Sequence, residues 1–336
     1  MKIVFYQSKD EWLSINQLFI VVRKHLPPFI NCSIVFFSYT GASVLNRLYD
    51  VLLGAFKRGN YINHVTGDFN YATYFMPKAN TILTIHDLYR LNENHPSSLK
   101  KFIFKWFWLK IPILKSAVVT AVSFTTKTEI LKYIKCPPEK IRVIYNCISA
   151  DFKPAPKVFN KTKPVLLQVG TRPNKNLERV VKAIAGLECK LNIIGEPAPA
   201  TIALMDDCKI DYSWQSNLSG EAVIQKYIDC DMVVFVSTFE GFGLPIIEAN
   251  TTERVVVTSN ISAMPEIAGN AACLVDPFNV KAIREGIIKV IEDDDYRQRL
   301  IEAGRKNKER FNAGLIAGQY CNLYEEVYNN ATKRKV

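Results

Sequence analysis

The sequence has no long apolar run, no paired-cysteine motif and few histidines. None of its apolar stretches approaches the roughly 18 to 20 residues that span a bilayer. Its opening residues, MKIVFYQSKDEW, lack the basic, apolar and small-residue order of a signal peptide. The eight cysteines include no C-x-x-C pair and no metal-like spacing with the four histidines. We therefore expect a cytoplasmic protein with reduced thiols and no zinc site.

The charge of the chain is unevenly distributed. The formal net charge is +11, and residues 1–150 hold 19 Lys and Arg against 8 Asp and Glu, whereas residues 151–336 hold 24 of each sign. A field of one sign on one half of a protein favours an anionic partner there, such as a phospholipid, a lipid phosphate or a nucleic acid.

Short β-branched segments alternate with segments of helical spacing along most of the chain. This pattern is typical of a parallel sheet with helical crossovers. It occurs over residues 1–145 and restarts at residue 165, after a proline-rich stretch over 146–164 that has the composition of a linker. We expect two doubly wound α/β domains, over residues 1–150 and 151–316. The helix predicted over 317–336 either completes the second domain or crosses back to the first.

The stretch STFEGFGLPIIEAN, residues 237–250, follows a predicted buried strand and leads into a helix. Gly241 and Gly243 allow a sharp turn and a close backbone approach to a ligand. The amides at the start of the helix, near Leu244, form an anion site suited to a diphosphate. A carboxylate facing a diphosphate is repelled, so Glu240 and Glu248 are expected to bind hydroxyl groups beside it. An acid in the first helical turn can also serve only as a partner of the helix dipole.

The sequence FEGFGLPIIEA resembles the signature of two glutamates separated by seven residues in retaining GT-B glycosyltransferases, most of all glycosyltransferase family 4. The resemblance implies two Rossmann-like domains facing across a cleft, with the acceptor on the first and a UDP- or GDP-sugar donor on the second. It also implies that Glu240 lies by the donor sugar, that the loop amides hold the diphosphate, and that Glu248 binds the ribose. The donor-binding residues carried over are Gly170, Thr171, Arg172, Lys175, Glu240, Gly241, Phe242, Gly243, Leu244 and Glu248.

A second glycine turn, in LLQVGTRPNKNLERVVKAI from Leu166, carries Arg172 and Lys175. Two cations beside a helix start can neutralise a diphosphate leaving group, and solvated loop cations are the alternative interpretation. The turn resembles the family's basic turn, with a shorter spacing and with Thr171 where many members have arginine. The resemblance implies catalytic roles for Arg172 and Lys175.

Other polar residues follow predicted strands of the first domain. TILTIHDLYR places His86 just after a strand, and the resemblance implies that this histidine reaches the transferred sugar, completing the catalytic set with Glu240, Arg172 and Lys175. HVTGD places His64 and Asp68 after another predicted strand, as further candidate residues at the carboxyl end of a strand. Ser123 is the expected N-cap of a helix.

Asp229 and Asp231 form a D-x-D sequence, which binds a metal in a different glycosyltransferase architecture. Here the two residues directly precede a predicted buried strand, and a structural role is favoured. We expect no metal and no cofactor, since the nucleotide sugar is a substrate.

The stretch SSLKKFIFKWFWLKIPILKSA, from Ser97, combines lysines with aromatic residues. On a helical projection, Phe102, Ile103, Trp106 and Phe107 share one side, which can face the core. The other side carries the residues expected to meet an anionic membrane surface: Lys100, Lys101, Phe104, Lys105 and Trp108. Peripheral docking on the inner face of the membrane would bring the cleft to a lipid-linked acceptor. A solvated amphipathic helix is the alternative.

The function that these features favour is metal-independent transfer of a hexose from a nucleotide diphosphate sugar to a hydroxyl of a saccharide or lipid-linked acceptor, in the synthesis of a cell-surface glycan such as a lipopolysaccharide. A glycoside hydrolase would use the two glutamates but would have no use for a phosphate-binding turn. A GT-B epimerase would turn over without an acceptor. A non-catalytic basic protein binding nucleic acid would show salt-sensitive affinity and no preference among nucleotide sugars, and the sequence contains no nucleic-acid motif.

Overall fold

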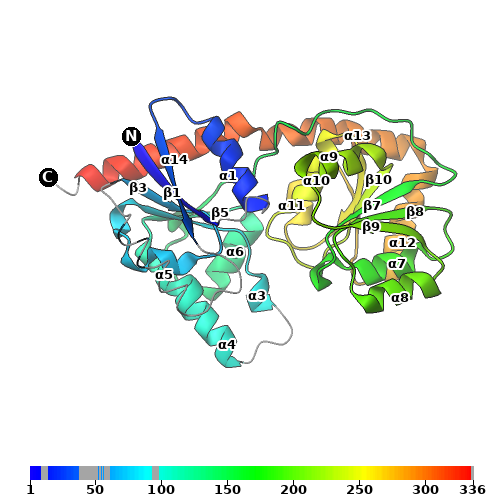
Figure 1. Ribbon diagram of the computed structural model, residues 1–336, viewed down its shortest axis with the longest axis horizontal. Coiled ribbons are helices and arrows are strands. Elements are labelled where there is room, and N and C mark those ends of the chain that lie inside the picture. Colours follow the sequence, from blue (N-terminus) through cyan, green and yellow to red (C-terminus); the bar gives the residue numbers. More distant parts are fainter. Residues whose placement is uncertain are drawn as a thin grey trace. The chain divides into compact units, whose positions relative to one another are not determined.

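The computed structural model describes residues 1–8, 14–37, 61–92 and 98–333, together with Leu52, Gly54 and Phe56. The chain divides into two compact units, each of which is described by itself (Figure 1). Unit 1 comprises Met1–Ser149 and Asn312–Val336, and unit 2 comprises Ala150–Phe311. The second domain predicted over 151–316 therefore ends five residues earlier than expected.

Unit 1 is built on sheet A, which has six parallel strands in the order β2-β1-β3-β4-β5-β6. The strands are β1 Lys2–Ser8, β2 Asn31–Phe37, β3 Ile62–Val65, β4 Thr81–Ile85, β5 Val118–Ala121 and β6 Ile141–Val143. The helical segments are α1 Ser14–Lys24, η1 Asn70–Phe75, η2 Lys78–Asn80, α3 Tyr89–Asn92, α4 Ser98–Ile103, η3 Phe104–Lys110, α5 Ile111–Lys115, α6 Phe124–Tyr133, η4 Pro138–Lys140 and α14 Ala313–Lys333.

Unit 2 is built on sheet B, which also has six parallel strands, in the order β12-β11-β10-β7-β8-β9. The strands are β7 Val165–Val169, β8 Lys190–Ile194, β9 Asp211–Gln215, β10 Met232–Phe235, β11 Val255–Ser259 and β12 Cys273–Val275. The helical segments are η5 Pro173–Lys175, α7 Leu177–Ile184, α8 Pro199–Asp207, α9 Gly220–Asp229, α10 Leu244–Thr251, α11 Met264–Ala268, α12 Val280–Glu292, α13 Asp294–Asn307 and η6 Lys308–Phe311.

The two parallel sheets confirm the predicted α/β class. Inner strands such as β4 and β11 are buried at every position, as expected for strands covered by helices on both faces. Side chains cap several helices, and the predicted N-cap Ser123 accepts a hydrogen bond from the Thr126 amide at 3.0 Å. Strand β9 was not predicted, because DYSWQ is a polar edge strand that alternates only partly between exposed and half-buried positions.

The C-terminal helix α14 belongs to unit 1, where it lies beside strands from the start of the chain (Figure 1). Its buried face includes Ile316, Tyr320, Tyr324 and Val327, which pack with Phe5 and other residues of β1 and α1. The helix begins at Ala313, four residues before the predicted position, because Asn312 caps it through the amides of Gly314 and Leu315.

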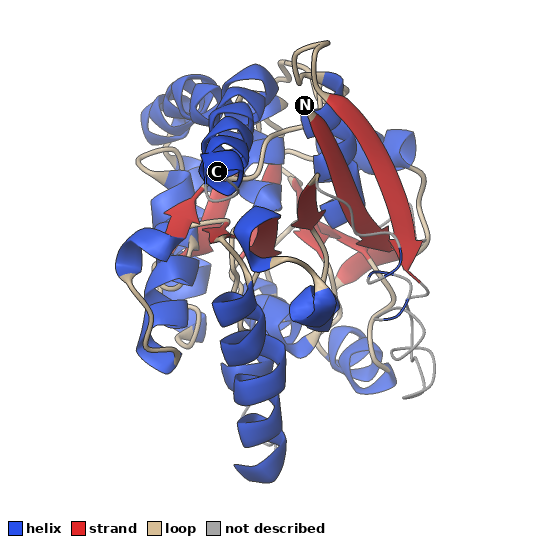
Figure 2. Cartoon of the chain, turned by 90° about the vertical axis from the view of Figure 1, so that its left-hand side faces the viewer, coloured by secondary structure: helices blue, strands red, loops and turns tan. Residues whose placement is uncertain are grey.

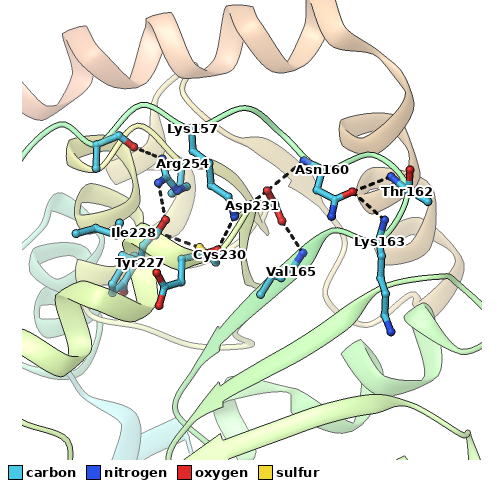
Figure 3. A network of polar contacts seen from close by, with 12 residues as sticks. Lys157, Asn160, Thr162, Lys163, Val165, Tyr227, Ile228, Cys230, Asp231 and Arg254 are labelled. Atoms are coloured by element: carbon cyan, nitrogen blue, oxygen red, sulfur yellow. Dashed lines mark hydrogen bonds and ion pairs between the residues drawn. The ribbon is translucent and has the colours of Figure 1, made fainter.

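The proline-rich stretch predicted as a linker is fixed to unit 2 over most of its length (Figure 3). Asp231 accepts hydrogen bonds from the amides of Val165 at 2.8 Å and Asn160 at 3.2 Å, and its carboxylate lies 3.0 Å from Lys157 Nζ. The buried Arg254 guanidinium donates to the carbonyls of Ala155 at 2.7 Å and of Ile228 at 2.6 Å. Asp231 thus has the structural role expected of the D-x-D sequence, and the segment from Ala150 is part of unit 2 rather than a free linker.

Helices α4, η3 and α5 form a continuous rod that projects from unit 1 (Figures 1 and 2). The prediction of its two sides was wrong. The large apolar side chains of α4 and η3 that are exposed to solvent are Leu99, Phe102, Ile103, Trp106 and Phe107, with exposed fractions of 37 to 66%. We call this set the aromatic face. Phe104 and Trp108, predicted to be exposed, are half-buried against the core of unit 1.

Two physical features explain the reversal. Trp108 has an indole N–H that needs a partner, and it donates to the Asp68 carbonyl at 3.2 Å while its ring packs on Tyr71. The segment η3 is a π-helix, so a projection at 3.6 residues per turn misplaces its side chains. Lys101 and Lys105 are half-buried, and the side chain of Lys100 lies outside the described residues.

Within the described ranges, no helix combines the length and the apolar character that are needed to cross a membrane.

Candidate functional site

The candidate site lies at the carboxyl edge of sheet B, where the direction of strand succession reverses. The chain runs from β7 outward to β8 and β9, and then returns to place β10 on the other side of β7. The strands β7 and β10 are therefore neighbours, and the chain leaves them toward opposite sides of the sheet. Open α/β sheets bind their ligands beside the loops at such a point, which here are the loops after β7 and β10. The first loop carries Thr171, Arg172 and Lys175, and the second carries Glu240 and the glycine turn.

The structure brings Lys175 and Glu240 together. Lys175 Nζ lies 2.7 Å from Glu240 Oε1, and the two side chains are only 20% and 16% exposed. Asn174 Nδ2 donates to the same oxygen at 3.3 Å, and the Lys175 ammonium lies 4.8 Å from the centroid of the Phe235 ring. The pair is thus partly withdrawn from water, where charge interactions are stronger than at a free surface.

Gly170 explains how the Lys175 side chain reaches Glu240. It has a φ of +86°, and a Cβ at this position would lie 3.1 Å from Cγ and Cε of Lys175. The lysine stem therefore lies across the turn, against a backbone that has no side chain. Gln168 closes the turn, because its Nε2 donates to the carbonyls of Gly170 at 3.3 Å and Lys175 at 3.0 Å.

The other two residues of this turn have different surroundings. Thr171, which stands where many family members have arginine, donates from Oγ1 to the Glu196 carbonyl at 2.8 Å. Arg172 is exposed, and among the described residues its guanidinium has no hydrogen-bond or ion-pair partner. The turn therefore presents one paired cation, Lys175, and one unpaired cation, Arg172.

The glycine turn after β10 has the geometry that the sequence predicts. Gly243 adopts the left-handed region with a φ of +109° and precedes α10, whose first turn contains Pro245 and whose N terminus has no side-chain cap. The Phe242 ring is buried and packs edge-on against Phe311 at 5.6 Å. Because Phe242 anchors the turn inward, the start of α10 and its amides are held at the edge of the sheet.

Glu248 lies in the second turn of α10 rather than in its first turn as expected, and it is held by a tyrosine from α9. Tyr227, whose side chain is fully buried, donates its hydroxyl to Glu248 Oε2 at 2.5 Å. Burial raises the pKa of Glu248 to about 7, and Tyr227 and Lys175 oppose this rise.

His86 belongs to unit 1 and follows β4, as expected. Its Nε2 lies 2.8 Å from the Thr66 carbonyl oxygen, so the proton of a neutral ring is placed on Nε2 and Nδ1 is the acceptor. Its role toward the residues of unit 2 stays a prediction.

His64 is not a site residue. It lies within β3 rather than after it and is completely buried, with Nδ1 2.8 Å from the Tyr324 hydroxyl and Nε2 2.7 Å from Thr84 Oγ1. Burial, reinforced by His86, lowers the pKa of His64 to about 3. This neutral histidine joins sheet A to α14. Asp68 is exposed.

Several residues at the candidate site were missed by the sequence analysis, namely Gln168, Asn174, Tyr227 and Ser262. Ser262 lies after β11, and its Oγ accepts from the Glu240 amide at 3.1 Å. Asn174 had one signal, its position directly before Lys175. Tyr227 and Ser262 had none, because their proximity to the glutamates depends on the strand order of sheet B.

Two family models match the chain. The model described as "Glycosyl transferases group 1" matches residues 149–307, and the model "Glycosyltransferase Family 4" matches residues 61–152. The first match contains the two glycine turns and both glutamates, and the second contains His86.

Curated relatives include the O-antigen chain mannosyltransferase B of Escherichia coli, 25% identical over 296 residues, which cover 79% of this chain and 74% of the relative. Another is the O-antigen chain mannosyltransferase RfbU of Salmonella typhimurium, 28% identical over 218 residues, which cover 62% of this chain and 60% of that protein.

Solved structures share the fold of the whole chain. The sucrose-phosphate synthase of Thermosynechococcus elongatus superposes with a TM-score of 0.78 at 16% identity, covering 98% of this chain and 99% of that one. The Anabaena protein HepE, solved in complex with UDP-glucose, superposes with a TM-score of 0.76 at 15% identity, covering 97% of this chain and 100% of that one. The two family matches and the shared fold together show that this chain is a GT-B glycosyltransferase of family 4.

Proposed function

We propose that the protein is a retaining hexosyltransferase that moves a sugar from a nucleotide diphosphate sugar to a hydroxyl of a saccharide or lipid-linked acceptor during cell-surface glycan synthesis. The observation that carries the proposal is the Lys175 and Glu240 pair beside the glycine turn, at the point where the strand order of sheet B reverses. The relatives named as O-antigen mannosyltransferases make a mannosyl donor the first to test. HepE, which binds UDP-glucose, supports a nucleotide-sugar donor.

In this proposal the residues of the two loops bind different parts of the donor. The amides at the start of α10 receive the diphosphate, as helix N termini receive anions. Arg172, which is unpaired in the described structure, and Lys175 neutralise the charge that develops on the leaving phosphate. Glu240 accepts hydrogen bonds from hydroxyls of the sugar, and Glu248 accepts them from the ribose.

The proposed reaction is front-face substitution at the anomeric carbon. The bond from this carbon to the phosphate oxygen breaks, and a bond to the acceptor oxygen forms on the same face. The acceptor's proton passes to the departing phosphate oxygen. Glu240 positions the sugar and does not attack it, and His86 contacts the transferred sugar from unit 1. No step requires a metal or a cofactor.

A donor-binding screen tests this proposal first. Thermal unfolding is measured with UDP, GDP and their common sugar conjugates, and we expect at least one nucleotide sugar to raise the melting temperature. The same donor is then incubated with and without saccharide acceptors. Stabilisation by no nucleotide would contradict the proposal at its first step, and turnover of the sugar without any acceptor would favour an epimerase or a hydrolase.

We further propose that unit 1 docks on an anionic membrane through the aromatic face, which would bring the enzyme to a lipid-linked acceptor. The face carries large apolar side chains whose exposed fractions are 53% for Phe102 and 47% for Phe107. Lys101, Lys105 and Lys110 lie on the same rod, and the Lys110 ammonium lies 3.6 Å from the Trp106 ring centroid. Exposed aromatic rings interleaved with cations suit the headgroup region of a bilayer.

Sedimentation with vesicles tests the docking surface. We expect the protein to bind vesicles containing phosphatidylglycerol at low salt, and to bind neutral phosphatidylcholine vesicles much less. The double variant Phe102→Ser/Phe107→Ser should lose most of this binding. Phe29→Ser is the matched control, since Phe29 is also an exposed phenylalanine of unit 1 that lies outside the rod. Equal binding by the double variant and the control would contradict the proposal.

A further inference from the structure

The backbone of Glu240 is held from one side by a residue of the loop after β11. Ser262 Oγ accepts a hydrogen bond from the Glu240 amide at 3.1 Å and donates one to the Glu240 carbonyl at 2.7 Å. A single hydroxyl thus satisfies both backbone groups of the glutamate. Ser262 itself has a φ of +58°, in the left-handed region that side chains rarely occupy. Its hydroxyl is therefore placed by a backbone conformation that the surrounding loop must maintain.

From the other side, Glu240 is held by Asn174 in the loop after β7. Asn174 Nδ2 donates to the Phe239 carbonyl at 3.0 Å and to Glu240 Oε1 at 3.3 Å. The Asn174 carbonyl accepts from the Thr238 amide at 2.8 Å. The order β11-β10-β7 places the Glu240 loop between the loops of Ser262 and Asn174. Three successive loops of one sheet edge thus meet at this glutamate.

We propose that Asn174 and Ser262 are positioning residues that fix the Glu240 carboxylate for the donor sugar. The inference rests on the proposed function, in which Glu240 contacts the sugar. A carboxylate that accepts hydrogen bonds from particular hydroxyls of a substrate contributes most to catalysis when its position is fixed before the substrate binds. Ser262 fixes the position of the Glu240 backbone, and Asn174 fixes the position of the Glu240 carboxylate.

The chemistry of the two residues suits this task better than that of Lys175. In the structure Lys175 pairs with Glu240, but a lysine ammonium on a flexible stem is also attracted to a diphosphate. When the donor arrives, Lys175 can turn toward the phosphates. Asn174 and Ser262 are neutral, so the anion does not compete for them and they keep Glu240 in place.

The test compares Ser262→Gly with Lys209→Gly. Glycine suits a positive φ, so Ser262→Gly removes the hydroxyl without straining the backbone. Lys209 is the matched control, because it also has a positive φ, of +51°, and lies in the turn before β9, at the opposite edge of sheet B. The measurements are donor affinity, kcat for transfer, and hydrogen exchange of the peptide that contains Glu240, with no ligand present.

For Ser262→Gly we expect nucleoside diphosphate affinity within about 2-fold of wild type and kcat lowered about 10- to 100-fold, as expected for a displaced catalytic group. Exchange of the Glu240 amide should accelerate, because this amide donates to Ser262. Asn174→Ala should lower kcat in the same way. Lys209→Gly should change none of these quantities.

A second comparison shows whether Ser262 acts through Glu240. In a Glu240→Ala background, assayed with a radiolabelled donor, Ser262→Gly should cause no further loss of kcat. The inference is overturned if the losses multiply in that background, if kcat is unchanged in Ser262→Gly, or if nucleoside diphosphate affinity falls as much as kcat. A wild-type protein that transfers no sugar would overturn the proposed function, and the exchange measurement then decides separately whether Ser262 holds Glu240.

Discussion

The carboxyl edge of sheet B and the interior of sheet A both contain clusters of polar side chains, and the two clusters are built in opposite ways. In sheet A, His64 lies between Tyr324 and Thr84, is fully buried, and uses both ring nitrogens in hydrogen bonds. At the edge of sheet B, Lys175 and Glu240 are charged and partly exposed. Arg172 has no partner within the described part of the chain.

This difference separates a structural cluster from a candidate site. A buried polar cluster whose groups satisfy one another has no bonding capacity left for a ligand. A charged cluster at the edge of a sheet keeps donors and acceptors that a substrate can use. The following predictions test this distinction, from the largest expected effect to the smallest.

Removal of either member of the charged pair should have the largest effect. We expect Lys175→Ala and Glu240→Ala each to lower kcat/KM by about 100- to 1,000-fold, because each removes an electrostatic contact to the reacting groups. Transfer of radiolabelled sugar measures the change. Lys182→Ala, an exposed lysine on the adjacent helix α7, should keep wild-type activity. A Lys175→Ala protein with full activity would contradict the assignment of this edge as the site.

A substitution in the buried cluster of sheet A should instead lower stability and leave donor affinity unchanged. We expect His64→Ala to lower the free energy of unfolding by about 3 kcal/mol, because it creates a cavity and removes the hydrogen bond between His64 and the buried Tyr324 hydroxyl. The affinity for the donor should stay within about 2-fold of wild type if the protein is assayed well below its melting temperature. Urea unfolding and donor titration measure the two quantities. Unchanged stability with lost donor affinity would reverse the roles of the two clusters.

His64 also predicts a dependence of stability on pH. Its pKa falls from 6.5 to about 3 in the folded protein because the ring is buried. Below pH 6.5 the unfolded chain binds a proton that the folded protein does not, so stability should decrease by about 1.4 kcal/mol per pH unit toward pH 4. This contribution should be absent in His64→Ala and present in a His25→Ala control, since His25 is exposed.

A substitution at Gly170, in the turn after β7, should have an intermediate effect on activity and stability. In Gly170→Ala the new Cβ meets the Lys175 stem at 3.1 Å, on a backbone with a φ of +86°. We expect roughly 10-fold lower kcat/KM from displacement of the lysine, and about 1 kcal/mol lower stability from the positive φ. Gly186→Ala provides the control, because Gly186 has a φ of +73° and open space around its Cβ position. It should lose similar stability and no activity.

The smallest expected effect concerns Glu248 and pH. The pKa of Glu248 is raised from 4.5 to about 7, so the folded protein holds a proton there that the unfolded chain loses. The group therefore stabilises the fold fully below pH 4.5, and this contribution is lost as the pH rises to 7. Donor affinity should increase several-fold across pH 6 to 8 as the carboxylate forms. Tyr227→Phe removes a hydroxyl that lowers this pKa and should shift the increase to higher pH.

The two loops of the candidate site in unit 2 could be identified from the sequence because their residues are close together along the chain. The glycine turn and both glutamates lie within 14 consecutive residues, and the turn with Arg172 and Lys175 is equally local. The apolar strands β7 (VLLQV) and β10 (MVVF) precede these turns. Local sequence therefore specified which residues reach the edge of sheet B.

Features that depend on packing between distant segments could not be read in this way. Ser262 and Tyr227 reach the two glutamates only through the strand order of sheet B. The rod from α4 to α5 carries aromatic residues on both sides, and its periodicity could not indicate that the side with Trp108 packs against Tyr71 and Asp68. His64 was assigned beyond the end of a strand, whereas β3 continues to Val65 and buries it.

The central claim is that Glu240 holds the donor sugar while Glu248 holds the nucleotide. Calorimetric titration tests this claim most directly. The nucleotide sugar and its nucleoside diphosphate are each titrated into the wild-type protein, Glu240→Ala and Glu248→Ala. We predict that Glu240→Ala removes the difference in affinity between the two ligands, and that Glu248→Ala weakens both ligands equally. A Glu240→Ala protein that still prefers the nucleotide sugar, or a Glu248→Ala protein with full affinity for the nucleoside diphosphate, would contradict the account.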